Sequence, residues 1–146
     1  MATRTAHTAW KGSLQEGSGQ VELASSKLGT FEVSFPKRVA DEADGTTSPE
    51  ELIAAAHSSC FAMQFSGMLG NAGSVPDALD VRADVSLGPD PAGGVRLTGI
   101  KLTVRGEVSG LDSAKFAEIA QAAKQSCPVS KALTGVEITV DAALKS

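Results

Sequence analysis

Residues 48–70 read SPEELIAAAHSSCFAMQFSGMLG, and this stretch decides the fold. Ser48 is typical of a helix N-cap, Pro49 suits the first helical position, and Glu51 completes a capping box. Residues 52–70 contain no Asp, Glu, Lys or Arg, whereas a surface helix carries charge on one side. The stretch therefore predicts a long helix that is buried nearly all round.

A membrane span is the competing interpretation of this apolar stretch. The polar and small residues within it argue against a span; they are His57, Ser58, Ser59, Gln64, Ser66 and Gly67. A single domain of 146 residues can hardly bury such a helix on every side. We therefore expect a partner subunit to cover it, and a homodimer is our hypothesis.

Short segments of alternating polarity lie on both sides of the central helix. A second helix is expected from about Asp112 to Ser126, with an apolar stripe made by Phe116, Ile119, Ala120 and Ala123. An irregularity is expected at Gly99. Strands are expected at Thr8–Leu14, Gln20–Ala24, Phe31–Phe35, Val81–Leu87, Ile100–Val104 and Val136–Val140. In the third of these, we expect Phe31, Val33 and Phe35 to lie on a buried face. This order predicts one α+β domain over residues 1–146, mostly antiparallel.

The overall composition limits the classes of function. The chain has a formal net charge of −4 and only 4% aromatic residues, so we expect neither a basic phosphate-binding face nor a base-stacking platform. The first twenty residues contain no unbroken apolar run that would indicate a secretory signal. We expect a soluble cytoplasmic protein with no nucleic-acid or membrane partner.

The two cysteines are the candidates for chemistry. Cys60 lies within the central helix three residues after His57, so their side chains are neighbours on its surface. Cys127 closes the second helix, and Pro128 must end or restart that helix. If a new turn begins there, its backbone N–H groups favour a thiolate at Cys127. Either cysteine alone could also be an inert buried residue.

A zinc site is a second candidate, with nitrogen and sulfur ligands from His57, Cys60, Cys127 and His7. The spacing is poor for zinc because there is no Cys-x2-Cys pair and no second clustered histidine. The sequence also contains no glycine-rich phosphate loop and no nucleophile elbow. These observations leave the cysteines as the stronger candidates.

Two segments resemble the motifs of a known family: Thr47–Met63, TSPEELIAAAHSSCFAM, and Cys127–Leu133, CPVSKAL. Both are similar to signatures of the OsmC/Ohr family of osmotically inducible and organic hydroperoxide resistance proteins. The resemblance is closer to the OsmC branch and covers essentially the whole chain. It implies antiparallel sheets wrapped around two long central helices in an intertwined homodimer. It also implies a cysteine-based peroxidase without metal or other cofactor, which reduces organic hydroperoxides and is recycled by an external dithiol.

The resemblance also assigns the site residues. Cys60 matches the peroxidatic cysteine, Cys127 the resolving cysteine and Glu50 the active-site glutamate, while the upstream arginine matches Arg38, with Lys37 as its neighbouring rival. A buried thiol ionises poorly and arginine does not deprotonate, so we expect Arg38 to stabilise the Cys60 thiolate. Glu50 would orient Arg38 by a bidentate pair. The sulfenic acid formed on Cys60 would condense with Cys127 to a disulfide.

Four apolar side chains follow Cys60 on the central helix, and we expect most of them to lie in the core and some to border the sulfur: Phe61, Met63, Phe65 and Met68. An apolar approach to the sulfur favours bulky organic hydroperoxides over hydrogen peroxide. Two alternatives to an enzyme stay open. One is a non-catalytic redox or metal-binding module that uses the same cysteines, and the other is a structural dimer with inert thiols.

Overall fold

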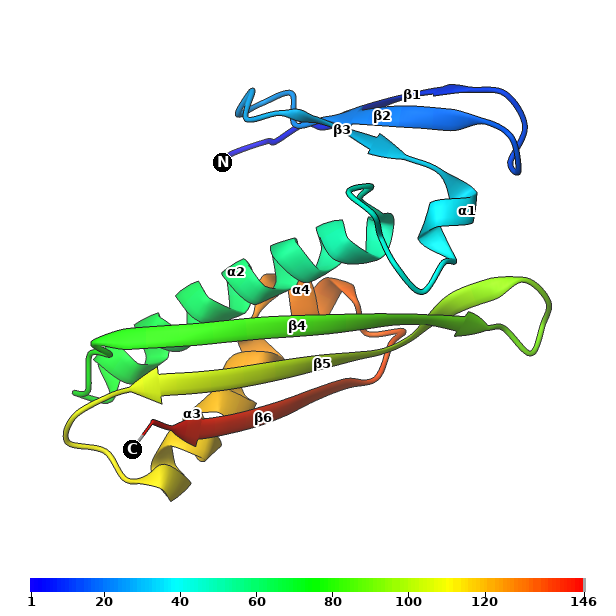
Figure 1. Cartoon of the computed structure of the whole chain (residues 1–146). Coiled ribbons are helices and arrows are strands. Elements are labelled where there is room, and N and C mark those ends of the chain that lie inside the picture. The colour runs from blue at the N-terminus through cyan, green and yellow to red at the C-terminus, as the bar shows by residue number, and fades with distance from the viewer. Residues whose placement is uncertain (146) are drawn as a thin grey trace. The chain divides into compact units, whose positions relative to one another are not determined.

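The computed structural model describes residues 1–145, and the contacts within the chain divide it into two compact units. Unit 1 is Met1–Leu52 and unit 2 is Ile53–Ser146. Helix α2 (Pro49–Asn71) begins in unit 1 and continues in unit 2. Figure 1 follows the elements in chain order. A single domain over residues 1–146 stays a prediction.

Unit 1 contains a three-stranded antiparallel sheet in the order β1-β2-β3. Its strands are β1 (His7–Lys11), β2 (Ser18–Glu22) and β3 (Thr30–Val33). Three strands were expected here, but each ends earlier than expected; β1 stops before Gly12, whose φ of +92° favours glycine. The predicted burial of Phe31 is wrong within this chain, because its side chain is 42% exposed. The buried positions, Gly19 and Val21, lie on the central strand β2.

A short helix, α1 (Phe35–Arg38), follows β3 and was missed by the sequence analysis. The Ser34 hydroxyl accepts a hydrogen bond from the Lys37 backbone N–H at 3.4 Å, and Pro36 lies in the first turn. Both features are typical of a helix start. Phe35 therefore begins a helix instead of ending a strand, and Arg38 is the last residue of that helix.

Helix α2 begins and ends where the sequence predicts. The Ser48 hydroxyl accepts a hydrogen bond from the Glu51 backbone N–H at 3.1 Å, which confirms the N-cap. The Glu51 carboxylate, however, accepts from the Thr47 hydroxyl at 2.6 Å, so the reciprocal half of the predicted capping box is replaced by this contact. The helix ends at Asn71, two residues before Gly73, which has a φ of +88°.

Unit 2 contains a second three-stranded sheet in the order β4-β5-β6. Its strands are β4 (Ala78–Pro89), β5 (Val95–Glu107) and β6 (Ile138–Leu144). The strands β4 and β5 form the expected hairpin, with a register shift between Ser86 and Leu87 beside the Ser86–Gly99 pair. Strand β6 pairs with β5 in parallel, so the expectation of antiparallel sheets is wrong at this edge. The chain returns through two helices between β5 and β6, and such a crossover connects parallel strands.

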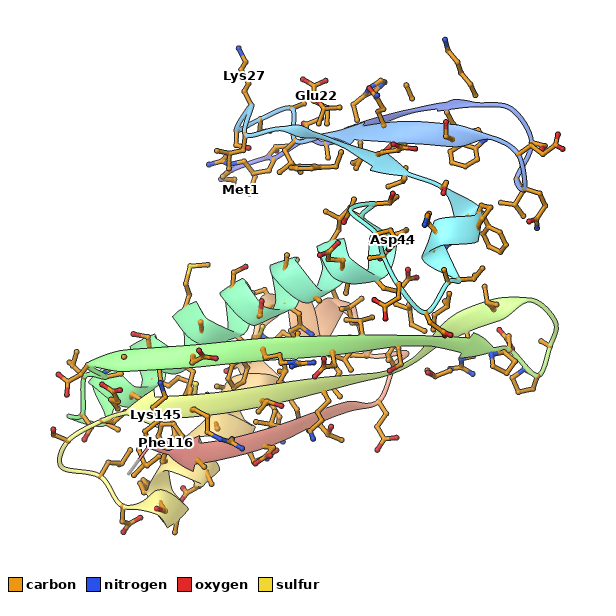
Figure 2. The ribbon with its side chains drawn as sticks, in the orientation of Figure 1. Met1, Glu22, Lys27, Asp44, Phe116 and Lys145 are labelled. Atoms are coloured by element: carbon orange, nitrogen blue, oxygen red, sulfur yellow. The ribbon has the colours of Figure 1, made fainter. Side chains whose placement is uncertain are left out.

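These two helices are α3 (Ser113–Ser126) and α4 (Pro128–Ala132), and Figure 1 shows them with α2 behind the β4-β5-β6 sheet. The Asp112 side chain caps α3 by accepting from the Lys115 backbone N–H at 2.7 Å. The predicted apolar stripe of α3 is confirmed. The core of unit 2 joins Phe116, Ile119, Ala120 and Ala123 of α3 to Phe61, Phe65 and Leu69 of α2 and to Leu102 and Val104 of β5. Figure 2 labels Phe116, whose ring centre lies 5.0 Å from that of Phe65.

Helix α2 buries one stripe of side chains instead of its whole surface. His57, Phe61, Phe65 and Leu69 recur at every fourth residue and each is 0% exposed, whereas Met63 is 71% exposed. The expectation of a helix buried nearly all round is therefore wrong for the single chain. By length and composition α2 could cross a membrane. Its fully buried stripe in the core of unit 2 is instead typical of the core helix of a soluble protein.

Candidate active site

Two free thiols meet inside unit 2. The Sγ atoms of Cys60 and Cys127 lie 3.3 Å apart, although the residues are 67 positions apart in the chain. This separation is longer than a disulfide bond of about 2.05 Å, and it places the sulfurs in direct contact. The Cys127 side chain is fully buried, while Cys60 is partly exposed. The structure thus brings together the two cysteines that the sequence singled out.

Cys127 reaches this position because Pro128 interrupts the helical path. Cys127 has an extended backbone (φ −62°, ψ 124°), as the residue before a proline prefers, and it is the only residue between α3 and α4. Its N–H still donates to the Ala123 carbonyl at 2.8 Å, which holds it against the end of α3. The predicted restart of a helix at Pro128 is confirmed.

The two sulfurs differ in their tendency to ionise. Burial raises the pKa of Cys60, and the contact with the Cys127 sulfur raises it further, so the net direction is upward. Burial also raises the pKa of Cys127, but the backbone N–H of Ser130, the Cys60 thiol and the Ser130 hydroxyl outweigh it, so the net direction is downward. The start of α4 therefore favours its charged form through electrostatics, as the sequence predicted.

A buried histidine–serine pair lies beside these sulfurs. His57 Nε2 and Ser130 Oγ are 2.7 Å apart; His57 is 0% exposed and Ser130 is 6% exposed. Burial lowers the pKa of His57 and favours the neutral imidazole. The Nδ1 atom is buried and has no hydrogen-bond partner among residues 1–145. No role was predicted for Ser130 from the sequence. The feature that could have indicated one is its position three residues after Cys127, in the first turn of the helix that restarts at Pro128.

Arg38 and Glu50 form the polar pair that was predicted, and both lie in unit 1. Arg38 Nη2 donates to Glu50 Oε1 at 2.7 Å, and Arg38 Nε donates to both carboxylate oxygens at 3.1 and 3.2 Å. The Glu50 side chain is 10% exposed and the Arg38 side chain 31%. Two donors of one guanidinium held by one carboxylate fix the plane of the arginine head group.

Lys37, the rival of Arg38, has a different partner. Its Nζ donates to Asp44 Oδ2 at 2.7 Å, and both side chains are exposed. The hydrogen bond and the charge of Lys37 lower the pKa of Asp44. Figure 2 labels Asp44 in the loop that precedes α2. The pairing with Glu50 therefore distinguishes Arg38 from its neighbour.

Other sequence candidates lie elsewhere. Phe61 and Phe65 are fully buried in the core, with ring centres 5.6 Å apart, so they do not line an open approach to Cys60. Within residues 1–145, no group of three or more His, Cys, Asp or Glu side chains is placed to hold a metal ion. His57 Nε2 is engaged by Ser130 instead. The geometry therefore lends no support to the zinc alternative.

Comparisons with known proteins agree with the motifs. The model of the family described as OsmC-like protein matches residues 41–141. The peroxiredoxin OsmC of Escherichia coli is 44% identical over 137 residues, covering 94% of this chain and 93% of that protein. An organic hydroperoxide resistance protein of Xanthomonas axonopodis is 28% identical over 120 residues, covering 81% of this chain and 82% of that protein.

The fold has solved counterparts. The crystal structure of an organic hydroperoxide resistance protein from Elizabethkingia anophelis has a TM-score of 0.80 at 25% identity, covering 99% of this chain and 98% of that chain. The organic hydroperoxide resistance protein OhrB of Bacillus subtilis has a TM-score of 0.74 at 29% identity, covering 97% and 98%. The chain therefore belongs to the OsmC/Ohr family and is closer to its OsmC branch.

Proposed function

We propose that this protein is a cysteine-based peroxidase that reduces organic hydroperoxides to alcohols and is recycled by an external dithiol. A peroxide-related redox role agrees with the names of its relatives, a peroxiredoxin and organic hydroperoxide resistance proteins. The observation that carries the proposal is the 3.3 Å contact between the free thiols of Cys60 and Cys127. Two inert core thiols would not need to touch.

Cys60 is the peroxidatic residue in this proposal because access separates the two sulfurs. Cys60 is partly exposed, whereas Cys127 is fully buried, so a hydroperoxide meets Cys60 first. The Cys60 thiolate attacks the terminal peroxide oxygen and the O–O bond breaks. The sulfur becomes a sulfenic acid and the alkoxide takes a proton to leave as the alcohol.

Arg38 and Glu50 are the proposed source of positive charge for this step. Burial raises the pKa of Cys60, so its thiolate needs a cationic partner. An arginine guanidinium carries a positive charge, and the bidentate pair with Glu50 fixes the orientation of Arg38. We propose that Arg38 stabilises the thiolate and then the charge that develops on the leaving oxygen.

The second and third steps restore the enzyme. The Cys127 sulfur attacks the Cys60 sulfenic acid, the S–O bond breaks and water leaves, which forms the Cys60–Cys127 disulfide. An external dithiol then reduces this bond by thiol–disulfide exchange and becomes a disulfide itself. Each turnover consumes one hydroperoxide and one dithiol and yields one alcohol, one water and one oxidised dithiol. In every step of the proposed cycle, a bond to the Cys60 sulfur forms or breaks.

The proposal includes an intertwined homodimer in which a second copy covers α2. The face of α2 opposite its buried stripe is exposed in the single chain, with Met63 71% exposed. An exposed apolar face on a core helix is what a partner subunit would bury. Sedimentation that finds only a monomer at micromolar concentration would refute this part. We also propose a cytoplasmic location, without nucleic-acid or membrane partners.

Counting thiols tests the peroxidase directly. One equivalent of cumene hydroperoxide added to reduced wild type should consume both thiols. Cys127→Ser should lose its single thiol and form an adduct with a sulfenic-acid reagent such as dimedone, while Cys60→Ser should keep its thiol. Wild type that keeps both thiols would refute the proposed function.

Substrate preference is a separate part of the proposal. We expect kcat/KM to be higher for cumene or tert-butyl hydroperoxide than for hydrogen peroxide, because apolar side chains surround the helix segment that carries Cys60. Phe61 and Phe65 lie in the core, which leaves the exposed Met63 and the partly buried Met68 as the apolar candidates on this helix. A higher kcat/KM for hydrogen peroxide would overturn the preference.

A further inference from the structure

We propose that His57 and Ser130 are positioning residues for the resolving sulfur: the imidazole holds the Ser130 hydroxyl so that its proton is directed to Cys127 Sγ. This inference rests on the proposed function, because it assigns a role in the second step, the attack of Cys127 on the Cys60 sulfenic acid. Both residues lie within the two motifs quoted above, but no role in the cycle has been assigned to either.

The pair connects the same two segments of the chain that carry the cysteines. His57 lies on α2, one turn before Cys60, and Ser130 lies on α4, one turn after Cys127. The 2.7 Å contact between Nε2 and Oγ is short, and both side chains are almost completely removed from solvent. Two contacts therefore link α2 to residues 127–130: the sulfur contact of Cys60 and Cys127 at 3.3 Å and the contact of His57 and Ser130 at 2.7 Å.

The orphaned nitrogen fixes the direction of the hydrogen bonds. Burial lowers the pKa of His57 and favours the neutral form, in which only one ring nitrogen carries a proton. A proton on Nδ1 would leave a buried N–H donor without an acceptor, because Nδ1 has no partner among residues 1–145. A proton on Nε2 leaves only an unused acceptor and lets Nε2–H donate to Ser130 Oγ. The hydroxyl proton of Ser130 is then free to point away from the imidazole.

Ser130 is the third residue of α4 and Cys127 is its N-cap, and helical side chains lean toward the helix N-terminus, so the Ser130 hydroxyl lies on the side of the Cys127 sulfur. The Ser130 backbone N–H and hydroxyl both lower the pKa of Cys127, against the opposing effect of burial. Charged side chains on the neighbouring elements are engaged elsewhere: Lys124 Nζ donates to the Ile138 carbonyl at 3.2 Å, and Lys131 is exposed. Residues 52–70 of α2 contribute no charged side chain. Cys60 is thus the titratable group in contact with this sulfur; His57 acts on it through Ser130, and the proposed charge of Arg38 acts on Cys60.

A thiolate at Cys127 serves both later steps of the cycle. In the second step it attacks Cys60 Sγ, and the departing hydroxide takes a proton to leave as water. In the third step, when the dithiol attacks Cys60 Sγ, the S–S bond breaks and Cys127 leaves as a thiolate. A lower pKa makes a thiol a faster leaving group. The Ser130 hydroxyl stabilises the same charge in both directions.

The first test isolates the resolving thiol. In a Cys60→Ser background Cys127 is the only cysteine, so thiolate absorbance near 240 nm followed against pH reports its pKa alone. Ser130→Ala in this background should raise that pKa, and His57→Leu should raise it in the same direction. His57→Gln should restore it, because the glutamine amide can still donate to Ser130 Oγ. Adding His57→Leu to Ser130→Ala should raise it no further, since both act through one hydroxyl.

Ser126→Ala is the matched control. Ser126 Oγ accepts from Gln64 Nε2 at 3.0 Å, so it also joins α2 to the region of Cys127, one residue away from it. The substitution removes the same hydroxyl and a comparable hydrogen bond between elements. A purely structural role of Ser130 predicts that Ser126→Ala and Ser130→Ala behave alike. Our inference predicts that only Ser130→Ala changes the titration of Cys127.

The second test uses the two-cysteine protein and follows disulfide formation after one equivalent of cumene hydroperoxide by rapid alkylation and mass spectrometry. For each unit by which Ser130→Ala raises the pKa of Cys127, disulfide formation should be about threefold slower at a pH below that pKa, because less thiolate is present. At a pH above that pKa it should be about threefold faster, because a more basic thiolate is more nucleophilic. Rate profiles that cross in this way support the inference. An unchanged titration, or parallel profiles, would overturn it. Wild type that keeps both thiols would instead refute the proposed function, while the titration in the Cys60→Ser background would still decide the role of Ser130.

Discussion

Oxidation of the two thiols should make the folded protein more stable. The disulfide would close a loop between Cys60 and Cys127, which are 67 positions apart. A loop of this length removes enough conformational entropy from the unfolded chain to stabilise the folded state by about 4 kcal/mol. Because the sulfurs already lie 3.3 Å apart, little of this gain should be lost to distortion of the fold. For a chain of this size the gain corresponds to a rise in Tm of roughly 10 °C.

Thermal unfolding of matched samples at one protein concentration would measure this gain. Wild type is oxidised with one equivalent of cumene hydroperoxide, and the disulfide is verified by thiol counting before the scan. Cys127→Ser treated in the same way is the control, and its Tm should not rise because no loop is closed. An oxidised wild type with an unchanged or lower Tm would refute the reasoning. It would mean that the bond forms only in a conformation that departs from the native contact.

Three further predictions concern single side chains. Arg38→Lys keeps the charge but loses the two-donor pair with Glu50, so kcat/KM in a steady-state peroxidase assay should fall about 10- to 100-fold. Lys37→Ala removes only a surface ion pair and should leave kcat/KM unchanged. Burial lowers the pKa of His57 in the folded state. As the pH falls, the unfolded chain therefore binds a proton at His57 before the folded protein does. Below about pH 6.5 wild type should lose up to about 1.4 kcal/mol of unfolding free energy per pH unit. Urea titrations at pH 7 and pH 5 should show this loss, and His57→Gln should lack it. Phe65→Ala removes a fully buried ring and should lower the unfolding free energy by about 3–5 kcal/mol at pH 7 in urea; a loss under 1 kcal/mol would contradict its place in the core.

Local signals account for what the sequence predicted well. The capping residue Ser48, the following proline and the charge-free run define α2 without any knowledge of the rest of the chain. Pro128 likewise fixes the break between two helices, and this break determines where Cys127 lies. The apolar spacing of α3 predicted its buried face because packing against a sheet follows the helical repeat.

Features that depend on distant partners were missed or wrong. The direction of β6 depends on how the crossover returns the chain, and nothing within 138–144 encodes it. The contact between His57 and Ser130 joins residues 73 positions apart. The short α1 escaped detection because its four residues are too few to show a periodicity. The exposed face of α2 agrees with the expectation that one chain of this size cannot cover the helix on every side.

The corner between α3 and α4 makes the two cysteines mechanically unequal. Cys60 is clamped by the hydrogen bonds of a long helix, while Cys127 belongs to no helix and is tethered at its N–H to the Ala123 carbonyl. Closing the remaining distance between the sulfurs would therefore need backbone adjustment at Cys127 and none within α2. In the proposed cycle, the helix that carries Cys60 would keep one backbone conformation in the reduced and the oxidised protein.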